Sequence, residues 1–371
     1  MQCEFESRRR QESSSLLRFG IELVPDRPVF ELVEWDKAAE DAGFDNIWVT
    51  DHYNNRNPWC TLTTIALNTR RVLLGPGVTN PYHTSPALSA AAAATLNEIS
   101  GGRAVIGLGA GDRVTLATLG VQWRLPVSTV VEAIQVVRTL TRGDKCHLNG
   151  KVFNLRGAKL DVVRKSPVLD SEGRPITVDG KTVKAAPRIP IYAGAQGPQM
   201  LEKTAAVADG ILINASHPRD FRMALASIKK GARRAGRSMD ELDIGAYTAM
   251  SIADSYGEAM QGQTRMVVAY IVAGSPELIL RRHGIDAEAA EKIRSMLAQG
   301  RFGEAQGLVD DNMVDAFAIV GSSHDCIQRI DELVREGVTN FIAGSPIGPD
   351  KNRAIRKIGG EIIAHYRGVR T

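Results

Sequence analysis

The sequence has few cysteines, and none of them stands at the spacing of a metal site. Its four cysteines, Cys3, Cys60, Cys146 and Cys326, are far apart in the 371 residues, and the seven histidines are equally scattered. No Cys-x-x-Cys, His-Glu-x-x-His, Gly-x-Ser-x-Gly or Walker sequence occurs. These absences argue against a metal site, a metalloprotease and a serine hydrolase, and they indicate reduced thiols in a cytoplasmic protein.

Long apolar runs and a strong charge imbalance are also missing. No run approaches the ~18 residues of a membrane span, and the most apolar helical stretch, Pro86–Leu96, is mostly alanine. The net charge of +4 is mild, so it favours anionic small ligands more than nucleic acid. Met1–Leu16 is polar and arginine-rich, and we interpret it as a disordered tail rather than a nucleic-acid contact. We therefore expect neither a membrane nor a nucleic-acid partner.

What the sequence does contain is a regular alternation of short apolar strands and helices. At 43% hydrophobic residues, the chain is long enough for a sizeable core. Eight strand–helix units follow one another, and each strand is a short apolar run, which is typical of a parallel sheet covered on both faces. The pattern predicts an α/β fold, a single (β/α)8 TIM barrel over residues 17–371, with a doubly wound sheet as the alternative.

The boundaries of these elements follow from apolar periodicity and from glycine and proline stops. The expected strands are Arg18–Leu23, Asn46–Thr50, Val72–Val78, Ala104–Leu108, Ile244–Ala253, Asn340–Ala343 and two strands within Ile189–Ala215. The expected helices are Val29–Ala42, Pro58–Asn68, Ser85–Ser100, Thr129–Thr141, one from Gln199, Pro218–Ala235, Cys326–Glu336 and Asn352–Tyr366.

Two insertions interrupt the alternation, at about residues 162–188 and 255–315. The first is polar and turn-rich, and Ile176–Val178 and Lys181–Val183 flank Asp179-Gly180, which predicts a surface hairpin. The second contains at least two helices, near Ala259–Val272 and Ala287–Gln299, and its length indicates a lid or an oligomer surface.

The stretch Ile189–Ala215 carries the clearest signal for a ligand. It predicts a strand, the loop Gly194-Ala195-Gln196-Gly197, a helix and a second strand that ends near Asn214. Glycines let backbone approach a ligand, and free N–H groups at a helix start attract anions. The stretch is therefore either a cradle for a phosphate-bearing cofactor or an ordinary βαβ unit with a glycine turn.

Other candidates for chemistry also follow expected strands. Asp51-His52 is either a catalytic pair or a helix-capping Asp with a hydrogen-bonded His. Gly107–Gly111 has the spacing GxGxG, not the GxGxxG of a nicotinamide site, and in a barrel it would keep the rim open beside a flat ring. Glu22 ends an apolar strand, where an isolated acid is costly unless it is paired, protonated or functional.

Several segments together resemble the bacterial-luciferase-like superfamily of flavin and deazaflavin enzymes, and within it the methylenetetrahydromethanopterin reductases. The later segments are the more specific for the reductases, and the resemblance covers the barrel from Phe19 to the end. The matching segments are FGIELVP (Phe19–Pro25), WVTDHY (Trp48–Tyr53), GPGVTNPYHTSP (Gly75–Pro86), GGRAVIGLGAGD (Gly101–Asp112), IYAGAQGPQMLE (Ile191–Glu202), ADGILINASHP (Ala208–Pro218), GLVDDNMVDAFAIVG (Gly307–Gly321) and AGSPIGPD (Ala343–Asp350).

The resemblance implies a luciferase-like barrel that binds coenzyme F-420, an 8-hydroxy-5-deazaflavin with a phosphate-bearing tail. The implied reaction is reversible hydride transfer from the reduced deazaflavin to 5,10-methylenetetrahydromethanopterin, with tetrahydromethanopterin as the carrier of the one-carbon unit. The chain departs from the pattern in its N-terminal tail, in Ala110 where a proline is expected, and in the 162–188 hairpin.

Positions carried over from the resemblance define an expected site. It places Asp51 and His52 by the deazaflavin ring, and a non-proline cis peptide at Gly77-Val78 behind it. Asp112 and Thr115 would lie at the rim, and Glu22 on the substrate side. The residues implied for the tail phosphate are Gly194, Ala195, Gln196, Gly197 and Asn214.

Opening the methylene bridge leaves a nitrogen that needs a proton, so one general acid is useful. Asp112 and Glu22 are the candidates, with Asp112 placed first because open glycine backbone precedes it. The alternatives are a deazaflavin-dependent alcohol or sugar-phosphate dehydrogenase, in which His52 takes the hydroxyl proton, an FMN-dependent monooxygenase, and a barrel that binds flavin without turnover. We expect a homo-oligomer, a dimer or a tetramer.

Overall fold

Eight parallel strands form a closed ring in the computed structural model, which describes residues 17–163, 165–167, 177–178, 181–182 and 184–368. The strands follow the order β3-β2-β1-β15-β13-β12-β11-β4, and parallel bridges from Leu74 to Ala104 and from Thr79 to Leu108 join β3 to β4. The ring consists of β1 (Arg18–Leu23), β2 (Asn46–Val49), β3 (Leu73–Pro76), β4 (Ile106–Leu108), β11 (Ile191–Gly194), β12 (Gly210–Ile213), β13 (Asp243–Ile252) and β15 (Asn340–Ile347). The predicted (β/α)8 barrel is confirmed, and the doubly wound alternative is wrong.

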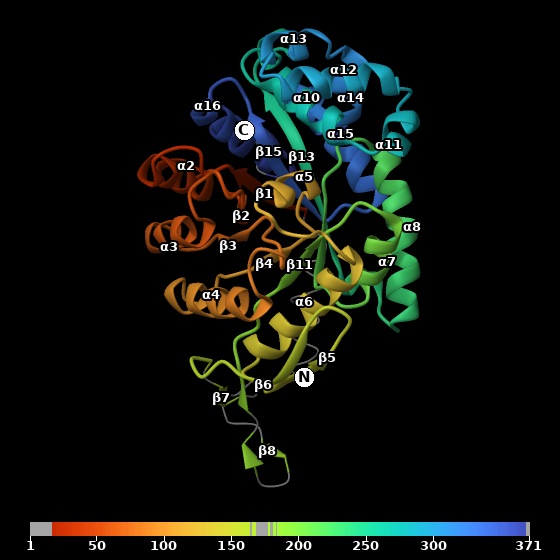
Figure 1. The fold of residues 1–371 in the computed structure, drawn as a ribbon. Coiled ribbons are helices and arrows are strands. Elements are labelled where there is room, and N and C mark those ends of the chain that lie inside the picture. Colours follow the sequence, from red (N-terminus) through yellow and green to blue (C-terminus); the bar gives the residue numbers. More distant parts are fainter. Residues whose placement is uncertain (1–16, 164, 168–176, 179–180, 183, 369–371) are drawn as a thin grey trace.

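Helices cover the outside of the ring (Figure 1). Proline at the first helical position starts several of them, as expected for a residue whose missing N–H costs nothing there. The covering helices are α2 (Val29–Asp41), α3 (Pro58–Asn68), α4 (Pro86–Ile99), α6 (Pro126–Thr141), α7 (Pro198–Ala205), α8 (Pro218–Arg234), α15 (Ser323–Glu336) and α16 (Lys351–Lys357). Each of these helices was expected from the sequence.

The closing helix contains a wider turn that the sequence did not indicate. After α16 the chain forms a π-helical segment, Ile358–Ile363, and then α17 (Ala364–Tyr366). A Cβ atom on Gly359 would lie 2.6 Å from the Cβ of Ala42, at the end of α2. The glycine therefore lets this helix pack directly on the backbone beside α2.

The main hydrophobic core lies between the ring and its helices, and a second cluster fills the ring itself. Inside the ring, Trp48 and Tyr192 pack edge to face, with ring centroids 5.1 Å apart, against Val105, Leu212 and Ile342. Because both faces of each strand are buried, the strands are near-continuous apolar runs.

The larger insertion forms a helical subdomain on one end of the barrel, labelled α10 to α14 in Figure 1. Its buried residues, among them Val268, Ile293 and Met313, form a core of their own. Its elements are α9 (Tyr256–Ala259), α10 (Thr264–Gly274), α11 (Glu277–Arg282), α12 (Ala287–Ala298), α13 (Phe302–Gly307) and α14 (Asp311–Phe317). The two helices expected in this insertion are confirmed as α10 and α12, although α10 begins at Thr264 rather than Ala259, because residues 260–263 separate it from α9.

After the insertion, β14 (Ala318–Gly321) pairs with the far end of β13, outside the ring. This strand was not expected from the sequence. Nor were the hairpin of β5 (Cys146–Asn149) and β6 (Asn154–Ala158) and the short helices α5 (Arg113–Thr118) and Met239–Glu241.

The smaller insertion lies at the opposite end of the barrel from α10 to α14 (Figure 1). β8 (Thr177–Val178) pairs antiparallel with β9 (Lys181–Thr182), which confirms the predicted pairing, and β7 (Ser166–Pro167) pairs with β10 (Lys184–Ala185). The turn residues Glu172-Gly173 and Asp179-Gly180 lie outside the described residues, as does the expected tail of residues 1–16. The division of the chain into tail, barrel and insertions stays a prediction.

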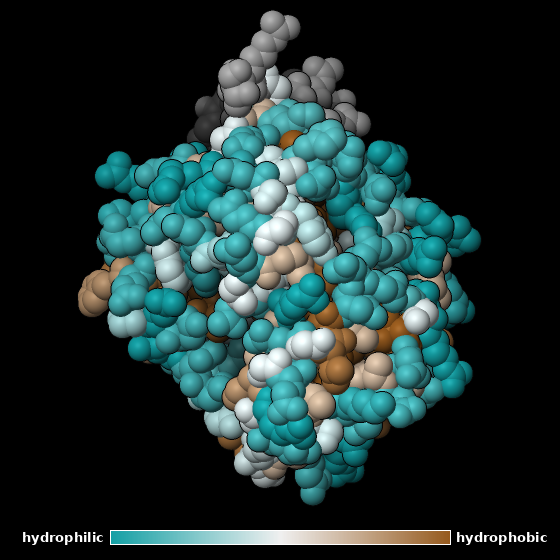
Figure 2. All heavy atoms as spheres, turned by 90° about the horizontal axis from the view of Figure 1, so that it is seen from above, coloured by the Kyte–Doolittle hydropathy of each residue, from teal (hydrophilic) through white to brown (hydrophobic). Residues whose placement is uncertain are grey.

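The surface is mostly hydrophilic when the molecule is viewed from above, with hydrophobic residues gathered in a group beside its centre (Figure 2). Among the described residues, no helix has the length and apolar character needed to cross a membrane.

Candidate active site

A cavity of about 710 Å³ opens at the carboxyl ends of the ring strands. Its size falls within the ~300–1,000 Å³ usual for small-molecule sites. Every residue that the sequence analysis selected lines this one cavity: Glu22, Asp51, His52, Gly77, Val78, Asp112, Thr115, Gly194, Ala195, Gln196, Gly197 and Asn214. They come from segments up to 192 residues apart, 22 to 214, and the ring brings them together.

One wall of the cavity is the end of β3. The Gly77-Val78 peptide bond is cis, as predicted, and the carbonyl oxygen of Gly77 accepts a hydrogen bond of 2.9 Å from the Tyr247 hydroxyl. A Cβ atom on Gly109 would lie 2.6 Å from a Val78 methyl group, and one on Gly194 would lie 3.2 Å from it. The neighbouring strand ends therefore need glycine to approach Val78, and these glycines serve close packing rather than a nicotinamide loop.

Glu22 presents its carboxyl group to the cavity from the end of β1. Its Oε2 accepts the Ser345 N–H at 2.8 Å, and its carboxyl group also hydrogen-bonds the Tyr247 hydroxyl. Burial has the largest effect and raises the pKa of Glu22, although Ser345, Lys351 and Tyr247 oppose that effect. A phenol has a single proton. The hydroxyl of Tyr247 therefore lies between two acceptors, the Gly77 carbonyl oxygen and the Glu22 carboxyl group, and its proton serves one of them at a time.

Asp51 is not a helix cap, which corrects one of the two interpretations of Asp51-His52. The N-cap of α3 is Asn57, whose side chain accepts the N–H groups of Trp59 and Cys60. Asp51 instead lies 3.5 Å from Nε2 of His83, measured to its Oδ2. An acid and an imidazole therefore meet at the cavity wall, but the imidazole belongs to His83, not to His52.

Asp112 caps the short helix α5 at the rim. Its Oδ2 accepts the Thr115 N–H at 2.7 Å. Beyond α5 the chain folds back, and the Trp123 indole donates to the carbonyl oxygen of Ala110 at 2.9 Å. One oxygen of Asp112 thus holds backbone in place, which is an ordinary structural use of an N-cap carboxylate.

The loop Gly194–Gly197 leads into α7, whose N-terminus has no side-chain cap. The helices α4 and α8 differ, since the side chains of Ser85 and His217 cap them, whereas α2, α6 and α11 also start without a side-chain cap. Gln196 reaches across to donate to the carbonyl oxygen of Asn214 at 2.9 Å. The N–H groups at the start of α7 are therefore not engaged by a capping side chain, which suits an anion.

Sequence reasoning missed several cavity residues, notably Tyr247, His83, Asn80 and Trp123. Asn80 and His83 lie inside the quoted segment GPGVTNPYHTSP, so the resemblance could have identified them. Tyr247 sits in the middle of β13, where an aromatic residue indicates a buried strand and nothing more.

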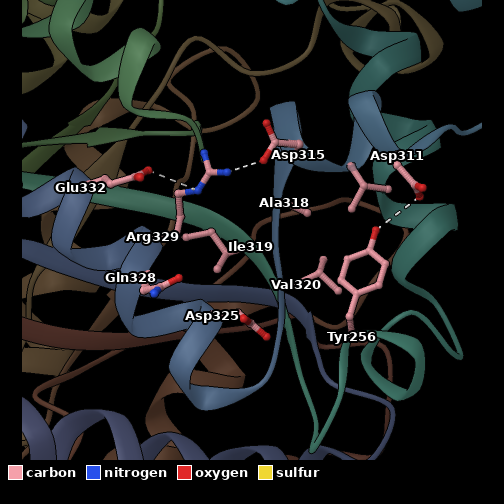
Figure 3. A pocket seen from close by; sticks show the side chains of 11 residues that line it. Tyr256, Asp311, Asp315, Ala318, Ile319, Val320, Asp325, Gln328, Arg329 and Glu332 are labelled. Carbon is pink, nitrogen blue, oxygen red and sulfur yellow. Dashed lines mark hydrogen bonds and ion pairs between the residues drawn. The ribbon is translucent and has the colours of Figure 1, made fainter.

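A smaller hollow of about 230 Å³ lies outside the ring, beside β14. Figure 3 shows five of its polar side chains paired with one another: Arg329 lies between Asp315 and Glu332, and Tyr256 faces Asp311. The other two, Asp325 and Gln328, hydrogen-bond Ser322 and His324. Because these groups satisfy each other, the cavity at the strand ends is the better candidate for the active site.

Comparison with known proteins leads to the same family as the resemblance of the sequence segments. The model of the family described as luciferase-like monooxygenase matches residues 12–340. A 5,10-methylenetetrahydromethanopterin reductase of Archaeoglobus fulgidus is 47% identical over 351 residues, which cover 94% of this chain and 99% of that protein. The solved structure of the coenzyme F-420-dependent tetrahydromethanopterin reductase from Methanopyrus kandleri has a TM-score of 0.84 at 40% identity, covering 95% and 99% of the two chains.

A more distant structure, an F-420-dependent secondary alcohol dehydrogenase in complex with an F-420–acetone adduct, has a TM-score of 0.72 at 20% identity, covering 96% of this chain and 100% of its own. That likeness concerns the fold alone. The chain therefore belongs to the luciferase-like monooxygenase family, and within it to the 5,10-methylenetetrahydromethanopterin reductases.

Proposed function

We propose that the protein catalyses reversible hydride transfer between reduced coenzyme F-420 and 5,10-methylenetetrahydromethanopterin, which gives 5-methyltetrahydromethanopterin in one-carbon metabolism and methanogenesis. The observation that carries the proposal is similarity over nearly the whole chain. Three relatives with the name of this reductase are 41–47% identical across 94% of it. The cavity residues described above are consistent with that activity.

The cavity fits a deazaflavin in two respects. The wall at Gly77-Val78, with Gly109 and Gly194 packed against Val78, leaves a backbone-lined surface against which a flat ring can lie. The uncapped start of α7, next to Gly197 and Asn214, supplies N–H groups for the phosphate of the tail. The ring side and the tail side thus lie in one continuous cavity.

When bound, the reduced deazaflavin supplies the hydride for the methylene carbon. The protein's residues hold the reacting carbons in contact, and such positioning supplies most of the rate enhancement in a direct transfer. When a C–N bond of the methylene bridge breaks, the nitrogen takes a proton. Glu22 is the better donor, because burial raises the pKa of its carboxyl group and that group faces the cavity, whereas Asp112 holds the Thr115 N–H.

Oxidation of reduced coenzyme F-420, followed by its absorbance with and without methylenetetrahydromethanopterin, tests the proposal. Oxidation that depends on the pterin and forms the methyl product is the expected result. Reduction of oxidised coenzyme F-420 by an alcohol or a sugar phosphate, or oxidation of a reduced flavin by oxygen without the pterin, would instead assign the protein to one of the alternative activities.

The deazaflavin should also bind in preference to FMN. Equilibrium titration of the protein with both compounds measures the two dissociation constants. Tighter binding of FMN would contradict the assignment of the cavity.

The protein is further proposed to be a cytoplasmic homo-oligomer, a dimer or a tetramer. The three described cysteines have free thiols. The neighbouring helices α2, α3 and α4 each expose a large apolar side chain, namely Phe30, Leu67 and Leu88. Light scattering after gel filtration measures the oligomeric state, and a monomer at micromolar concentration would contradict the proposal.

A further inference from the structure

A group of charged side chains joins the helical insertion to barrel helix α8, outside the cavity. The carboxylate of Asp220, in the first turn of α8, accepts hydrogen bonds from Arg282 and from Nε2 of His283, the latter at 2.9 Å. Arg282 is the last residue of α11 and His283 follows it. One barrel carboxylate therefore holds the end of an insertion helix, and α11 lies beside α8 in Figure 1. We call Asp220, Arg282 and His283 the clasp.

The clasp is shielded from water and fixed from several sides. The side chains of His283, Asp220 and Arg282 are 3%, 9% and 18% exposed. Rings of His217 and Phe317 pack on the imidazole of His283 at centroid distances of 5.0 and 5.6 Å. Hydrogen bonds to charged groups are stronger than neutral ones, and a shielded position preserves that strength.

The electrostatics of Asp220 agree with an ionised carboxylate in this position. Burial would by itself raise the pKa of Asp220, but the hydrogen bonds from His283 and Arg282 lower it below its ordinary value. The carboxylate therefore stays charged, and both of its oxygens are engaged by α11.

The other end of α11 reaches the cavity. Gly274, which ends α10, and Pro276, which precedes α11, both line it. A six-residue helix is about 9 Å long, so the clasp lies close behind this corner. On the barrel side, Asp220 follows the cavity residue Asn214 by one short loop. The clasp thus ties the 274–276 corner to the barrel segment that follows β12.

We infer that the clasp holds the 274–276 corner against the phosphate-bearing tail of the deazaflavin, so that Asp220 is a positioning residue for cofactor affinity. The inference rests on the proposed function and deepens it, because it assigns a role to the insertion at the same site. The ring side of the cavity, at Gly77-Val78, comes from β3 and has no bond to the clasp. Loosening the clasp therefore affects tail contacts and spares ring contacts.

The experiment measures equilibrium binding, by fluorescence, of two ligands: coenzyme F-420 and the ribityl deazaflavin that lacks the phosphate tail. Asp220→Asn keeps the shape of the side chain and removes its charge. We expect its affinity for coenzyme F-420 to fall by about 10-fold. A change of this size corresponds to the loss of roughly one charge-assisted hydrogen bond. The affinity for the tail-less compound should stay within about 2-fold of wild type, since the ring contacts are intact.

The chain offers a matched control in the neighbouring arginine. Arg281 is 74% exposed and pairs with Glu277 inside α11, so Arg281→Ala leaves the link to the barrel intact. Arg282→Gln is a second variant that removes the more exposed partner of Asp220. Where Asp220→Asn fails to fold, Arg282→Gln decides the question by the same two titrations.

The outcomes separate this inference from the proposed function. If wild type binds both deazaflavins and the clasp variants bind coenzyme F-420 equally well, the inference is overturned while the function stands. Equal weakening of both ligands would show a general loosening of the cavity and would overturn it as well. If wild type binds neither compound, the proposed function fails, and the clasp has no ligand to position.

Discussion

At the scale of single residues, the cavity contains two acids with different surroundings. Burial raises the pKa of Glu22 beside Tyr247, whereas Asp112 caps α5. We expect Glu22→Gln to lower kcat by roughly 100- to 10,000-fold, the range for general acid catalysis, while deazaflavin affinity changes little. Asp112→Asn should keep most of the turnover, because asparagine is also a good N-cap.

The pH profile of kcat provides a control for this assignment. Glu22 must be protonated to donate, so turnover should fall as the pH rises through its raised pKa. Glu22→Gln should lose that alkaline limb, whereas Asp112→Asn should retain it. A large loss of kcat in Asp112→Asn, together with near-normal turnover in Glu22→Gln, would restore Asp112 as the donor.

Asp36 is a second acid with unusual surroundings, but it lies in α2, away from the cavity. It is fully buried, and neither of its carboxylate oxygens has a hydrogen-bond partner among the residues that the structure describes. Burial raises its pKa well above the ordinary value. The folded state therefore keeps a proton that the unfolded chain releases above pH ~4, so this group lowers stability as the pH rises from there.

Asp36→Asn should consequently stabilise the protein at neutral pH. We expect its melting temperature at pH 7 to be higher by about 2–4 °C, the shift for roughly 1 kcal/mol in a large domain. At pH 4 the difference should vanish, because both side chains are then neutral. Thermal unfolding at both pH values measures this, and a lower melting temperature of the variant at pH 7 would contradict it.

At this scale, many residues of the cavity could be predicted from the sequence, but their hydrogen-bond partners could not. The resemblance and the glycine-rich strand ends placed twelve residues around one cavity, because the ends of parallel strands meet at one rim. The partners of those residues could not be predicted. Tyr247 contacts Glu22 and Gly77 only because the ring closes, and nothing local marks a mid-strand tyrosine as part of a site.

At the scale of elements, local signals explain which predictions succeeded. Proline at the helix starts fixed α3, α4 and α8, and glycine after the helix ends fixed α4 and α8, to within one or two residues. The elements that were missed depend on distant partners. β14 pairs with the end of β13 across the 60-residue insertion, and the π turn near Gly359 is set by packing on Ala42.

The hairpin of the smaller insertion leads to a prediction at this scale. Its described strands pair with one another, β7 with β10 and β8 with β9, and they lie at the end of the barrel opposite α10 to α14 in Figure 1, whereas the cavity is lined by Gly274 and Pro276 beside α10 and α11. We expect replacement of Ser166–Lys184 by a short glycine–serine link to leave deazaflavin affinity within about 2-fold, because changing the length of a surface loop costs little.

Titration with coenzyme F-420 and gel filtration of the shortened protein measure both parts of this prediction. Soluble folded protein with normal affinity is the expected outcome. Aggregation or a changed oligomeric state would show that the hairpin packs against another copy of the chain.

At the scale of the whole molecule, a buried polar network closes the barrel at the end opposite the cavity. Asp243, at the start of β13, accepts hydrogen bonds from Tyr192 at 2.9 Å and Asn340 at 3.0 Å, and it pairs with Arg18 at 2.6 Å. These residues come from β1, β11, β13 and β15. One carboxylate therefore links strands that are distant in the sequence. These strands must come together for the (β/α)8 barrel to close.

Asp243 should also set the sensitivity of the fold to acid. Burial alone would raise its pKa, but Arg18 and the hydrogen bonds from Thr339 and Asn340 lower it below the ordinary value. The folded state then holds the carboxylate charged at a pH where the unfolded chain is protonated. Its contribution to stability is present above pH ~4 and is lost as the pH falls through the lowered pKa.

Asp243→Asn should therefore destabilise the protein at pH 7 and flatten the acid side of its stability profile. The loss should be smaller than the ~3–5 kcal/mol typical of a broken buried ion pair, because Arg18 retains contact with water. Asp41→Asn, at the exposed end of α2, is the matched control and should follow the wild-type profile. Denaturant unfolding from pH 3 to pH 7 measures all three proteins. If wild type and Asp243→Asn lose stability in parallel on acidification, another group causes the acid sensitivity. The network would then stabilise the barrel through packing and hydrogen bonds that do not depend on the charge of Asp243.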